Sequence, residues 1–221
     1  MIGEDIKKSV FRDTKKFYST ADENVYGEQL IQFVKDQAGT KILDIGCATG
    51  NYCDILSRDG FDMYGVDINK EYVDKAVARG IKAFHIQDTL PFADATFDSA
   101  IMFEVLEHLT DPAPVIAEAR RIIKKNILFT VPNSGGIADL QHRGLLFEHF
   151  ADMDHKNFFT KESLFKLLSP YFSHIHITEG DPIHPSVLFK SKLLQLIVKI
   201  LCKVGIARPR FYFRLYVVAE P

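Results

Sequence analysis

One stretch, residues 42–51, constrains the fold of this chain more than any other; it reads ILDIGCATGN. Apolar residues on both sides of Asp44 indicate a short buried strand, and Gly46 and Gly50 bracket a tight turn after it. Because glycine lacks a Cβ, such a turn lets backbone N–H groups approach a ligand where the next helix begins. The stretch therefore predicts a strand–turn–helix unit that holds a ligand.

The glycine spacing separates two ligand classes that use such a turn. A dinucleotide fingerprint requires glycine at its first, third and sixth positions, which here hold Gly46, Ala48 and Asn51. Two of the three positions fail. Asp44 would repel a pyrophosphate but would attract a cation. S-adenosylmethionine, which carries a sulfonium and an ammonium and no phosphate, fits these residues better than NAD does.

A second acidic residue strengthens this interpretation. Asp67 ends another short apolar run, 21 residues after Gly46. This is close to the offset of about 20 residues at which a carboxylate accepts hydrogen bonds from a ribose diol in Rossmann-type sites. Asp88 follows the next apolar run and precedes the sequence Leu90-Pro91-Phe92.

Residues 44–50 resemble the first motif of class I S-adenosylmethionine-dependent methyltransferases, with Ala48 in place of the usual middle glycine. The resemblance covers roughly residues 40 to 180. Within the class, the chain is similar to the ubiquinone-biosynthesis methyltransferases. It implies S-adenosylmethionine as cofactor and S-adenosylhomocysteine as product. It also implies cofactor contacts at Tyr18, Asp44, Gly46, Cys47, Ala48, Gly50, Asn51, Tyr52, Asp67, Ile68, Asp88, Thr89, Phe103 and Glu104.

The alternation of apolar runs with helical periodicity predicts an α/β fold. Five strands alternate with helices, which requires a doubly wound parallel sheet. In the resembling fold two further strands complete a mostly parallel seven-stranded sheet with helices on both faces and an antiparallel last strand. The expected strands are residues 42–45, 62–69, 82–86, 97–103, 126–131, 174–177 and 211–218.

The chain length of 221 residues fits a single methyltransferase domain, 1–221, with three additions. Residues 1–38 are expected as a helical segment over the cofactor, and 133–160 as a substrate lid. Residues 183–208 are expected as a helical insertion before the last strand. Within it, 187–204 form an apolar helix with a thin basic edge, suited to a membrane surface, a lipidic substrate, a dimer face or packing on the domain.

Composition bears on the expected partners and cellular location of the protein. With 27 Lys and Arg against 29 Asp and Glu, the net charge is −2, so we expect no nucleic-acid partner. Cys47, Cys53 and Cys202 form no zinc or disulfide pattern, and the first 16 residues lack a signal peptide's apolar run. We expect a cytoplasmic protein, either a monomer or a homodimer.

The segment after the fourth strand carries candidate chemistry. If residues 104–108 form a helical turn, Glu104, Glu107 and His108 share one face and offer a half-shell of ligands for a divalent metal. The pattern resembles the Glu-x-x-Glu-His cluster of metal-assisted O-methyltransferases that act on ubiquinone precursors and on small-RNA 3′ ends. Metal-free relatives carry the same letters, so we expect these residues to line a pocket without a metal, and a metal held by Glu104, Glu107 and His108 is the alternative.

The expected activity is methyl transfer by in-line displacement to a small-molecule acceptor, an apolar one if the 187–204 helix covers it. His108, His149 and His155 are candidates to remove a proton from an acceptor hydroxyl or to position the acceptor. Three alternatives stay open: a metal-assisted O-methyltransferase, a protein that binds S-adenosylmethionine without catalysis, and a nicotinamide-dependent oxidoreductase.

Overall fold

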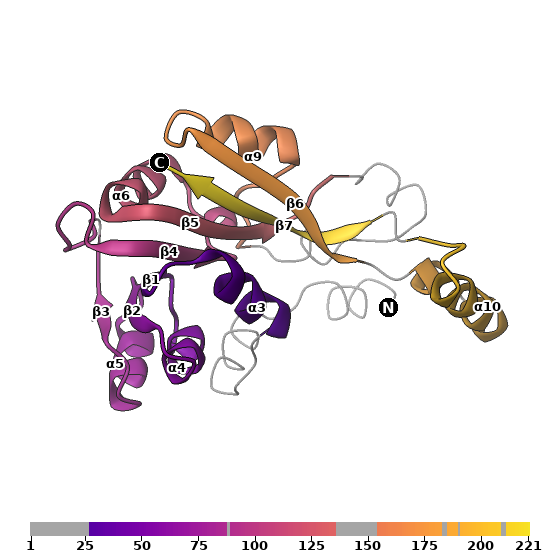
Figure 1. Ribbon diagram of the computed structural model, residues 1–221, viewed down its shortest axis with the longest axis horizontal. Helices are drawn as coiled ribbons and strands as arrows, with labels where there is room; N and C mark the ends of the chain where they lie inside the picture. The colour runs from indigo at the N-terminus through magenta and orange to yellow at the C-terminus, as the bar shows by residue number, and fades with distance from the viewer. Residues whose placement is uncertain (1–26, 88, 136–153, 183–184, 190, 209–210) are drawn as a thin grey trace, which may run out of the picture.

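The computed structural model describes residues 27–221 apart from 88, 136–153, 183–184, 190 and 209–210. Seven strands form one sheet in the order β3-β2-β1-β4-β5-β7-β6 (Figure 1). The strands are β1 Lys41–Ile45, β2 Asp62–Asp67, β3 Ala83–His85, β4 Phe97–Phe103, β5 Ile123–Pro132, β6 His174–Pro182 and β7 Tyr212–Glu220. The helices are α3 Glu28–Gln37, α4 Asn51–Arg58, α5 Lys70–Ala78, α6 Ala113–Ile122, α9 Lys161–Leu168 and α10 Lys192–Lys203, with the 3-10 turns η2 Leu106–His108 and η3 Pro185–Leu188.

The strand directions confirm the expected α/β fold. Strands β1 to β5 pair in parallel, and β7 lies antiparallel between β5 and β6. Strand β6 therefore runs in the same direction as the first five. The carboxyl ends of the parallel strands meet at one edge of the sheet, where open α/β folds place their ligands.

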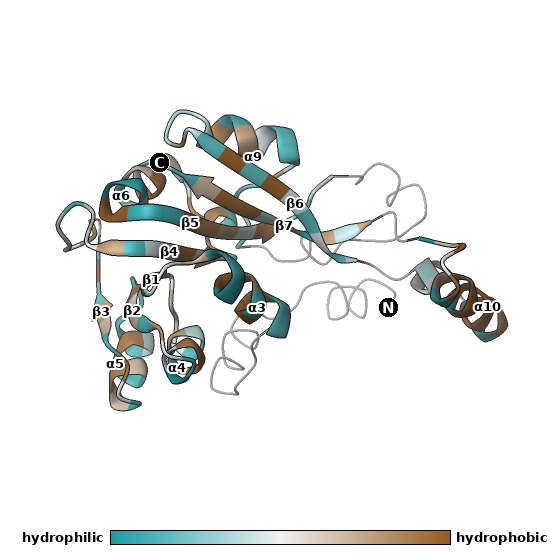
Figure 2. Ribbon diagram, in the orientation of Figure 1, coloured by the Kyte–Doolittle hydropathy of each residue, from teal (hydrophilic) through white to brown (hydrophobic). Residues whose placement is uncertain are grey.

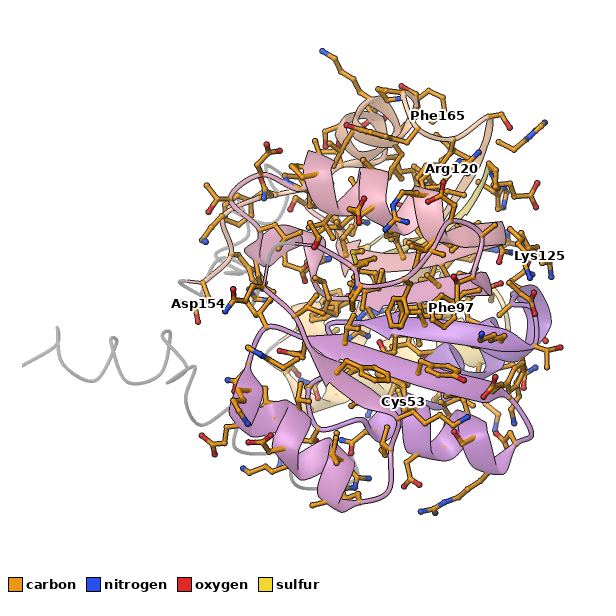
Figure 3. All side chains as sticks on the ribbon, turned by 90° about the vertical axis from the view of Figure 1, so that its left-hand side faces the viewer. Cys53, Phe97, Arg120, Lys125, Asp154 and Phe165 are labelled. Carbon is orange, nitrogen blue, oxygen red and sulfur yellow. The ribbon has the colours of Figure 1, made fainter. Side chains whose placement is uncertain are left out.

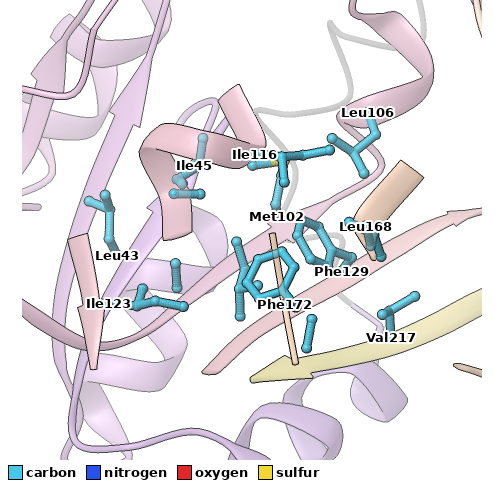
Figure 4. Close-up of a cluster of buried hydrophobic side chains, with 14 of the residues drawn as sticks. Leu43, Ile45, Met102, Leu106, Ile116, Ile123, Phe129, Leu168, Phe172 and Val217 are labelled. Carbon is cyan, nitrogen blue, oxygen red and sulfur yellow. The ribbon is translucent and has the colours of Figure 1, made fainter. Parts of the chain in front are cut away.

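Two hydrophobic clusters cover the two faces of the sheet. One includes Leu43, Met102 and Phe129 under α6 and α9, and Figure 4 shows part of it around Phe172. The other includes Ile42 and residues of α3, α4 and α5. Neighbours on β1 belong to opposite clusters because successive strand side chains point to opposite faces. Figure 3 shows Cys53 on one side of the sheet and Arg120 and Phe165 on the other.

Several element boundaries differ from the expected ones. Strand β6 extends to Pro182 and pairs with β7 up to Gly180 and again at Pro182, although its polar–apolar alternation ends at Ile177. The extension includes Glu179 and Gly180, residue types that are depleted in strands, so ladder pairing outweighs propensity there. Helix α9 begins at Lys161 after the N-cap Thr160, whose hydroxyl accepts from the Ser163 N–H in a capping box.

The apolar segment near the C-terminus is shorter as a helix than expected and does not pack on the sheet. Residues 185–188 form the turn η3, and only Lys192–Lys203 are α-helical. No residue of α10 is buried, so packing on the domain, one of the alternatives for this helix, is not what the structure has. Within the described residues, no helix is long and apolar enough to cross a membrane.

The expected N-terminal helical segment, 1–38, lies mostly outside the described residues. Its last part, which is described, forms α3. The expected lid, 133–160, is described only at its two ends, 133–135 and 154–160.

Candidate active site

The turn after β1 requires glycine at two positions. Gly46 and Gly50 have φ angles of +82° and +80°, in the left-handed region that other residues rarely adopt. A Cβ on Gly46 would lie 2.6 Å from Val105 Cγ2, and one on Gly50 would lie 2.6 Å from Ile81 Cδ1. Gly50 is also the N-cap of α4. Only glycine therefore fits at these two positions of the turn, which lies at the carboxyl edge of the sheet next to a helix N-terminus.

Ala48, the departure from the three-glycine motif, is accommodated with backbone strain. Its φ is +46°, a conformation that costs an L-residue roughly 1–2 kcal/mol. The Ala48 N–H donates to Asp67 Oδ2 at 2.9 Å, and this bond helps to hold the strained residue. The turn forms with the Ala48 methyl group in place of the usual glycine.

Asp67 ties two loops of the site together. Besides accepting from Ala48, its other oxygen accepts from the Asn69 N–H at 2.8 Å. Each carboxylate oxygen has a second lone pair, so the side chain keeps acceptor capacity for a ligand hydroxyl. Its neighbour Ile68 is 71% exposed at the same edge of the sheet. Thr89, another expected contact, is also exposed.

Asp44 is a buried carboxyl beneath the glycine turn. The Cys53 thiol donates to Asp44 Oδ2 at a sulfur–oxygen distance of 3.7 Å. Burial raises the pKa of Asp44 to about 7; the Cys53 hydrogen bond opposes the rise and the charge of Asp67 adds to it. No lysine or arginine among the described residues forms an ion pair with Asp44. A cationic ligand would offset the cost of ionising it.

Two expected cofactor contacts form an aromatic pair. Tyr52, in the first turn of α4, packs edge-on against Phe103 at the end of β4, with 5.4 Å between ring centroids. Burial raises the pKa of Tyr52 to about 12, so this phenol stays protonated. Cys47 is buried in the same loop, and a Cβ on Gly65 would lie 2.7 Å from its sulfur. Cys47 therefore supports the turn by packing under it.

Glu104 is oriented differently from the sequence-based expectation. It has a φ of +54°, and residues 104–108 do not form a continuous helical turn, because only Leu106–His108 adopt the 3-10 conformation. Its carboxylate pairs with Arg214 of β7, with Oε1 3.2 Å from Nε. Burial raises the pKa of Glu104, and the charge of Arg214 opposes that rise. In the described residues, Glu104 thus pairs with an arginine and does not group with Glu107 and His108, the other two members of the alternative metal set.

Glu107 and His108 lie close to His155. One ligand atom from each of the three lies within 4.8 Å of the others, and the two imidazole rings are 4.8 Å apart. Backbone bonds from Lys156 and Asn157 to the Glu107 carbonyl hold the two segments together. A carboxylate with two imidazoles is a donor set that suits a divalent transition metal. Glu107 is fully buried, so these residues fit a metal better than exposed acids would.

Three of the expected site residues, Tyr18, Asp88 and His149, lie outside the described residues.

Two arginines belong to the site although the sequence analysis did not include them. Arg79, which follows α5, donates to the Thr49 carbonyl at 2.7 Å and to Asn51 at 2.8 Å, so it braces the turn from below. Arg214 pairs with both Glu104 and Asp181. Arg214 was the more detectable of the two, because it is a lone charge in the apolar run FYFRLYVV.

A cavity of about 300 Å³ lies away from this edge, near the amino end of β2. Its charged lining residues include Asp54, Arg79, Asp62 and Lys82, and these form ion pairs with one another. The cavity therefore offers no uncompensated charge to a ligand.

Comparison with known proteins agrees with this geometry. A family model described as a methyltransferase domain matches residues 19–171. The ubiquinone biosynthesis O-methyltransferase of Vibrio cholerae is 33% identical over 94 residues, which cover 39% of this chain and 38% of that protein. The corresponding protein of Aliivibrio fischeri is 27% identical over 152 residues, or 59% of this chain and 62% of that protein. The chain thus matches less than two thirds of the length of these curated relatives.

The fold has a solved counterpart. The crystal structure of a SAM-dependent methyltransferase from Archaeoglobus fulgidus superimposes with a TM-score of 0.66, covering 93% of this chain and 99% of that one at 18% sequence identity. The sheet order, the glycine turn and a family match over more than half of the residues lead to one conclusion. The chain belongs to the methyltransferase-domain family of class I S-adenosylmethionine-dependent enzymes.

Proposed function

We propose that this chain binds S-adenosylmethionine and transfers its methyl group to a small-molecule acceptor. The observation that carries the proposal is Asp44, a buried carboxyl beneath a ligand-binding turn with no cationic partner among the described residues. S-adenosylmethionine supplies a methyl group on a sulfonium, which is a good leaving group. Family membership and the names of the curated relatives support the same activity.

The chain's own residues would bind and orient the reactants. Asp44 would meet the cationic end of the cofactor, and the backbone N–H groups that follow Gly46 would bind its polar atoms. Asp67 would accept hydrogen bonds from ribose hydroxyls through the carboxylate lone pairs that the Ala48 and Asn69 N–H groups do not use. Tyr52 and Phe103 would exclude water beside the reacting groups. Positioning of this kind contributes roughly 7–11 kcal/mol in favourable intramolecular models.

A hydroxyl acceptor would need to lose a proton, and His108 and His155 would be the candidates to take it. Their rings contact each other, and His108 Nδ1 lies 3.3 Å from the Asp154 carbonyl. That carbonyl would favour the tautomer that carries a proton on Nδ1, and in this tautomer Nε2 is the basic nitrogen. His149 remains a candidate from sequence. The relatives named as O-methyltransferases support an oxygen acceptor.

The cluster of Glu107, His108 and His155 favours a second candidate function, metal-assisted O-methylation. These three residues would hold a divalent metal, which lowers the pKa of a bound hydroxyl. Metal binding would make the same histidines ligands, so they would not serve as free bases.

Turnover separates these candidates. The wild-type protein would be incubated with S-adenosylmethionine and a panel of apolar phenols and alcohols, with and without Mg²⁺, and release of S-adenosylhomocysteine would be measured. Release with at least one acceptor is expected. Binding of S-adenosylhomocysteine without turnover on any acceptor would favour a non-catalytic binding protein.

Metal binding has its own test. If the metal site exists, Mn²⁺ should bind the wild type, and Glu107→Gln should weaken that binding at least tenfold, a loss of about 1.4 kcal/mol. Glu104→Gln should leave Mn²⁺ binding unchanged, because Glu104 pairs with Arg214. The reverse result would restore the metal set expected from sequence, and no Mn²⁺ binding would remove the metal-assisted candidate.

We further propose a cytoplasmic location, based on the three free thiols.

A further inference from the structure

Helix α10 is an apolar element without a core to pack on. It projects from the end of the sheet (Figure 1), and most of its ribbon has the colour of hydrophobic residues in Figure 2. Its exposed apolar side chains recur every three or four residues, so they share one face of the helix. We call this the apolar face of α10. It consists of Leu193, Leu196, Ile197, Ile200 and Val204, each between 43% and 66% exposed.

A basic edge adjoins the apolar face. At 3.6 residues per turn, Lys192, Lys199 and Lys203 fall on one line beside Leu196, and all three are exposed. The residues on the remaining side, including Gln195 and Cys202, are partly covered, and the Gln195 amide donates to the Phe189 carbonyl at 2.7 Å. Within the part of the chain that the structure describes, the helix thus contacts the preceding turn on one side, and its apolar face and its three lysines are exposed.

The charge of this segment is opposite to that of the rest of the chain. Residues 185–211 contain six of the 27 lysines and arginines and none of the 29 acidic residues. The remainder carries 21 basic against 29 acidic residues. A helix with a broad apolar face, a basic edge and no acids complements an anionic lipid surface.

We infer that α10 binds the surface of an anionic lipid bilayer. The apolar face would lie at the boundary between headgroups and acyl chains, and the lysines would contact lipid phosphates. Helix α10 has 12 residues, too few to span a bilayer, so the contact is peripheral.

The position of α10 gives this contact a consequence for the active site. The helix follows the carboxyl end of β6, which runs parallel to β5, and β7 begins after it (Figure 1). It therefore lies at the same edge of the sheet as the glycine turn. A bilayer bound there would lie on the active-site side and could supply an apolar acceptor directly. This step rests on the proposed methyltransferase function, whereas lipid binding itself does not.

A second copy of the chain is a poorer occupant of this face. Standard protein interfaces draw on about 20–30 residues a side. The exposed apolar side chains between residues 193 and 206 number only seven: Leu193, Leu194, Leu196, Ile197, Ile200, Val204 and Ile206. An antiparallel helix pair would also bring both lysine edges to the same side, and the segment has no acidic residue to compensate them.

Vesicle flotation tests the inference. The full chain is mixed with vesicles of phosphatidylcholine alone or with about 30% phosphatidylglycerol. We expect flotation with the anionic vesicles only, and release at about 0.5 M salt, where charge attraction is screened. Leu196→Gln/Ile200→Gln should abolish binding. Lys199→Glu/Lys203→Glu should weaken it at least about 20-fold, since each lysine contributes roughly a factor of five.

The double variant Phe165→Gln/Lys166→Glu is the matched control, because it makes the same types of change at exposed positions of α9. It should float like the wild type. The inference fails if the wild type does not bind anionic vesicles, or if Leu196→Gln/Ile200→Gln still binds them. It also fails if light scattering shows a dimer that this variant dissociates while the wild type does not float.

Titration with S-adenosylhomocysteine, run in parallel without vesicles, keeps the two proposals separable. Retained cofactor binding without flotation overturns the membrane inference alone. Flotation without cofactor binding supports the membrane inference and counts against the proposed function.

Discussion

Replacing Asp44 with asparagine should have opposite effects on stability and on ligand binding. Burial raises the pKa of Asp44 to about 7 in the folded protein, against 3.8 for the exposed group. The folded state therefore holds the proton more tightly than the unfolded state does. It follows that the free energy of unfolding falls as pH rises from about 4 to about 7, and then levels off.

The size of this effect follows from the shift in pKa. Each unit corresponds to about 1.4 kcal/mol, so ionising Asp44 costs the ligand-free protein about 4 kcal/mol by pH 8. Asparagine has nearly the same shape and no charge. The variant should match the wild type near pH 4 and should exceed its stability by up to about 4 kcal/mol at pH 8.

Urea denaturation of both ligand-free proteins between pH 4.5 and 8 measures this difference. Asp36→Asn, on the exposed surface of α3, serves as a control and should show no such trend. Binding of S-adenosylmethionine should weaken about 10- to 150-fold in Asp44→Asn, as expected when a charged hydrogen-bond partner is lost. A stability difference between the two proteins that does not change with pH would refute the raised pKa of Asp44. Unchanged binding would refute the role of Asp44 toward the cation.

Two predictions concern the turn itself, and both are checked by chemical denaturation. Gly60→Ala should cost about 1–2 kcal/mol, because the residue has a positive φ. Gly50→Ala should cost more, because its added methyl would also meet Ile81 at 2.6 Å. Equal losses would show that the contact does not matter. Ala48→Gly should leave stability unchanged or raise it by up to about 1 kcal/mol, because it relieves the strain at φ +46°, and a clear loss would mean that the Ala48 methyl makes a contact worth more than the strain.

Much of the fold could be predicted because the sequence repeats one local rule. Apolar runs such as 97–103 alternate with helical stretches, and the resulting strand β4 has the expected bounds. The cofactor turn was equally accessible, since glycine and aspartate occur there for reasons of backbone shape and charge.

The remaining features depend on contacts between distant parts of the chain. Nothing near Glu104 in the sequence shows that Arg214, 110 residues later, will pair with it and turn it away from Glu107. His155 was identified as a candidate base, but its place beside Glu107 and His108 depends on backbone bonds across nearly 50 residues. The exposure of α10 could not be read from its composition, because a hydrophobic helix is normally buried.

Calorimetric titration of the folded protein with S-adenosylhomocysteine, with Asp67→Ala beside it, tests the central claim most directly. Asp67 accepts the Ala48 N–H and is the residue that we propose to bind the cofactor ribose, so the variant should bind at least tenfold more weakly than the wild type, a difference of about 1.4 kcal/mol. NAD⁺ should bind neither protein. Absence of S-adenosylhomocysteine binding in the wild type, or equal affinity in Asp67→Ala, would contradict the assignment of this edge of the sheet as a cofactor site.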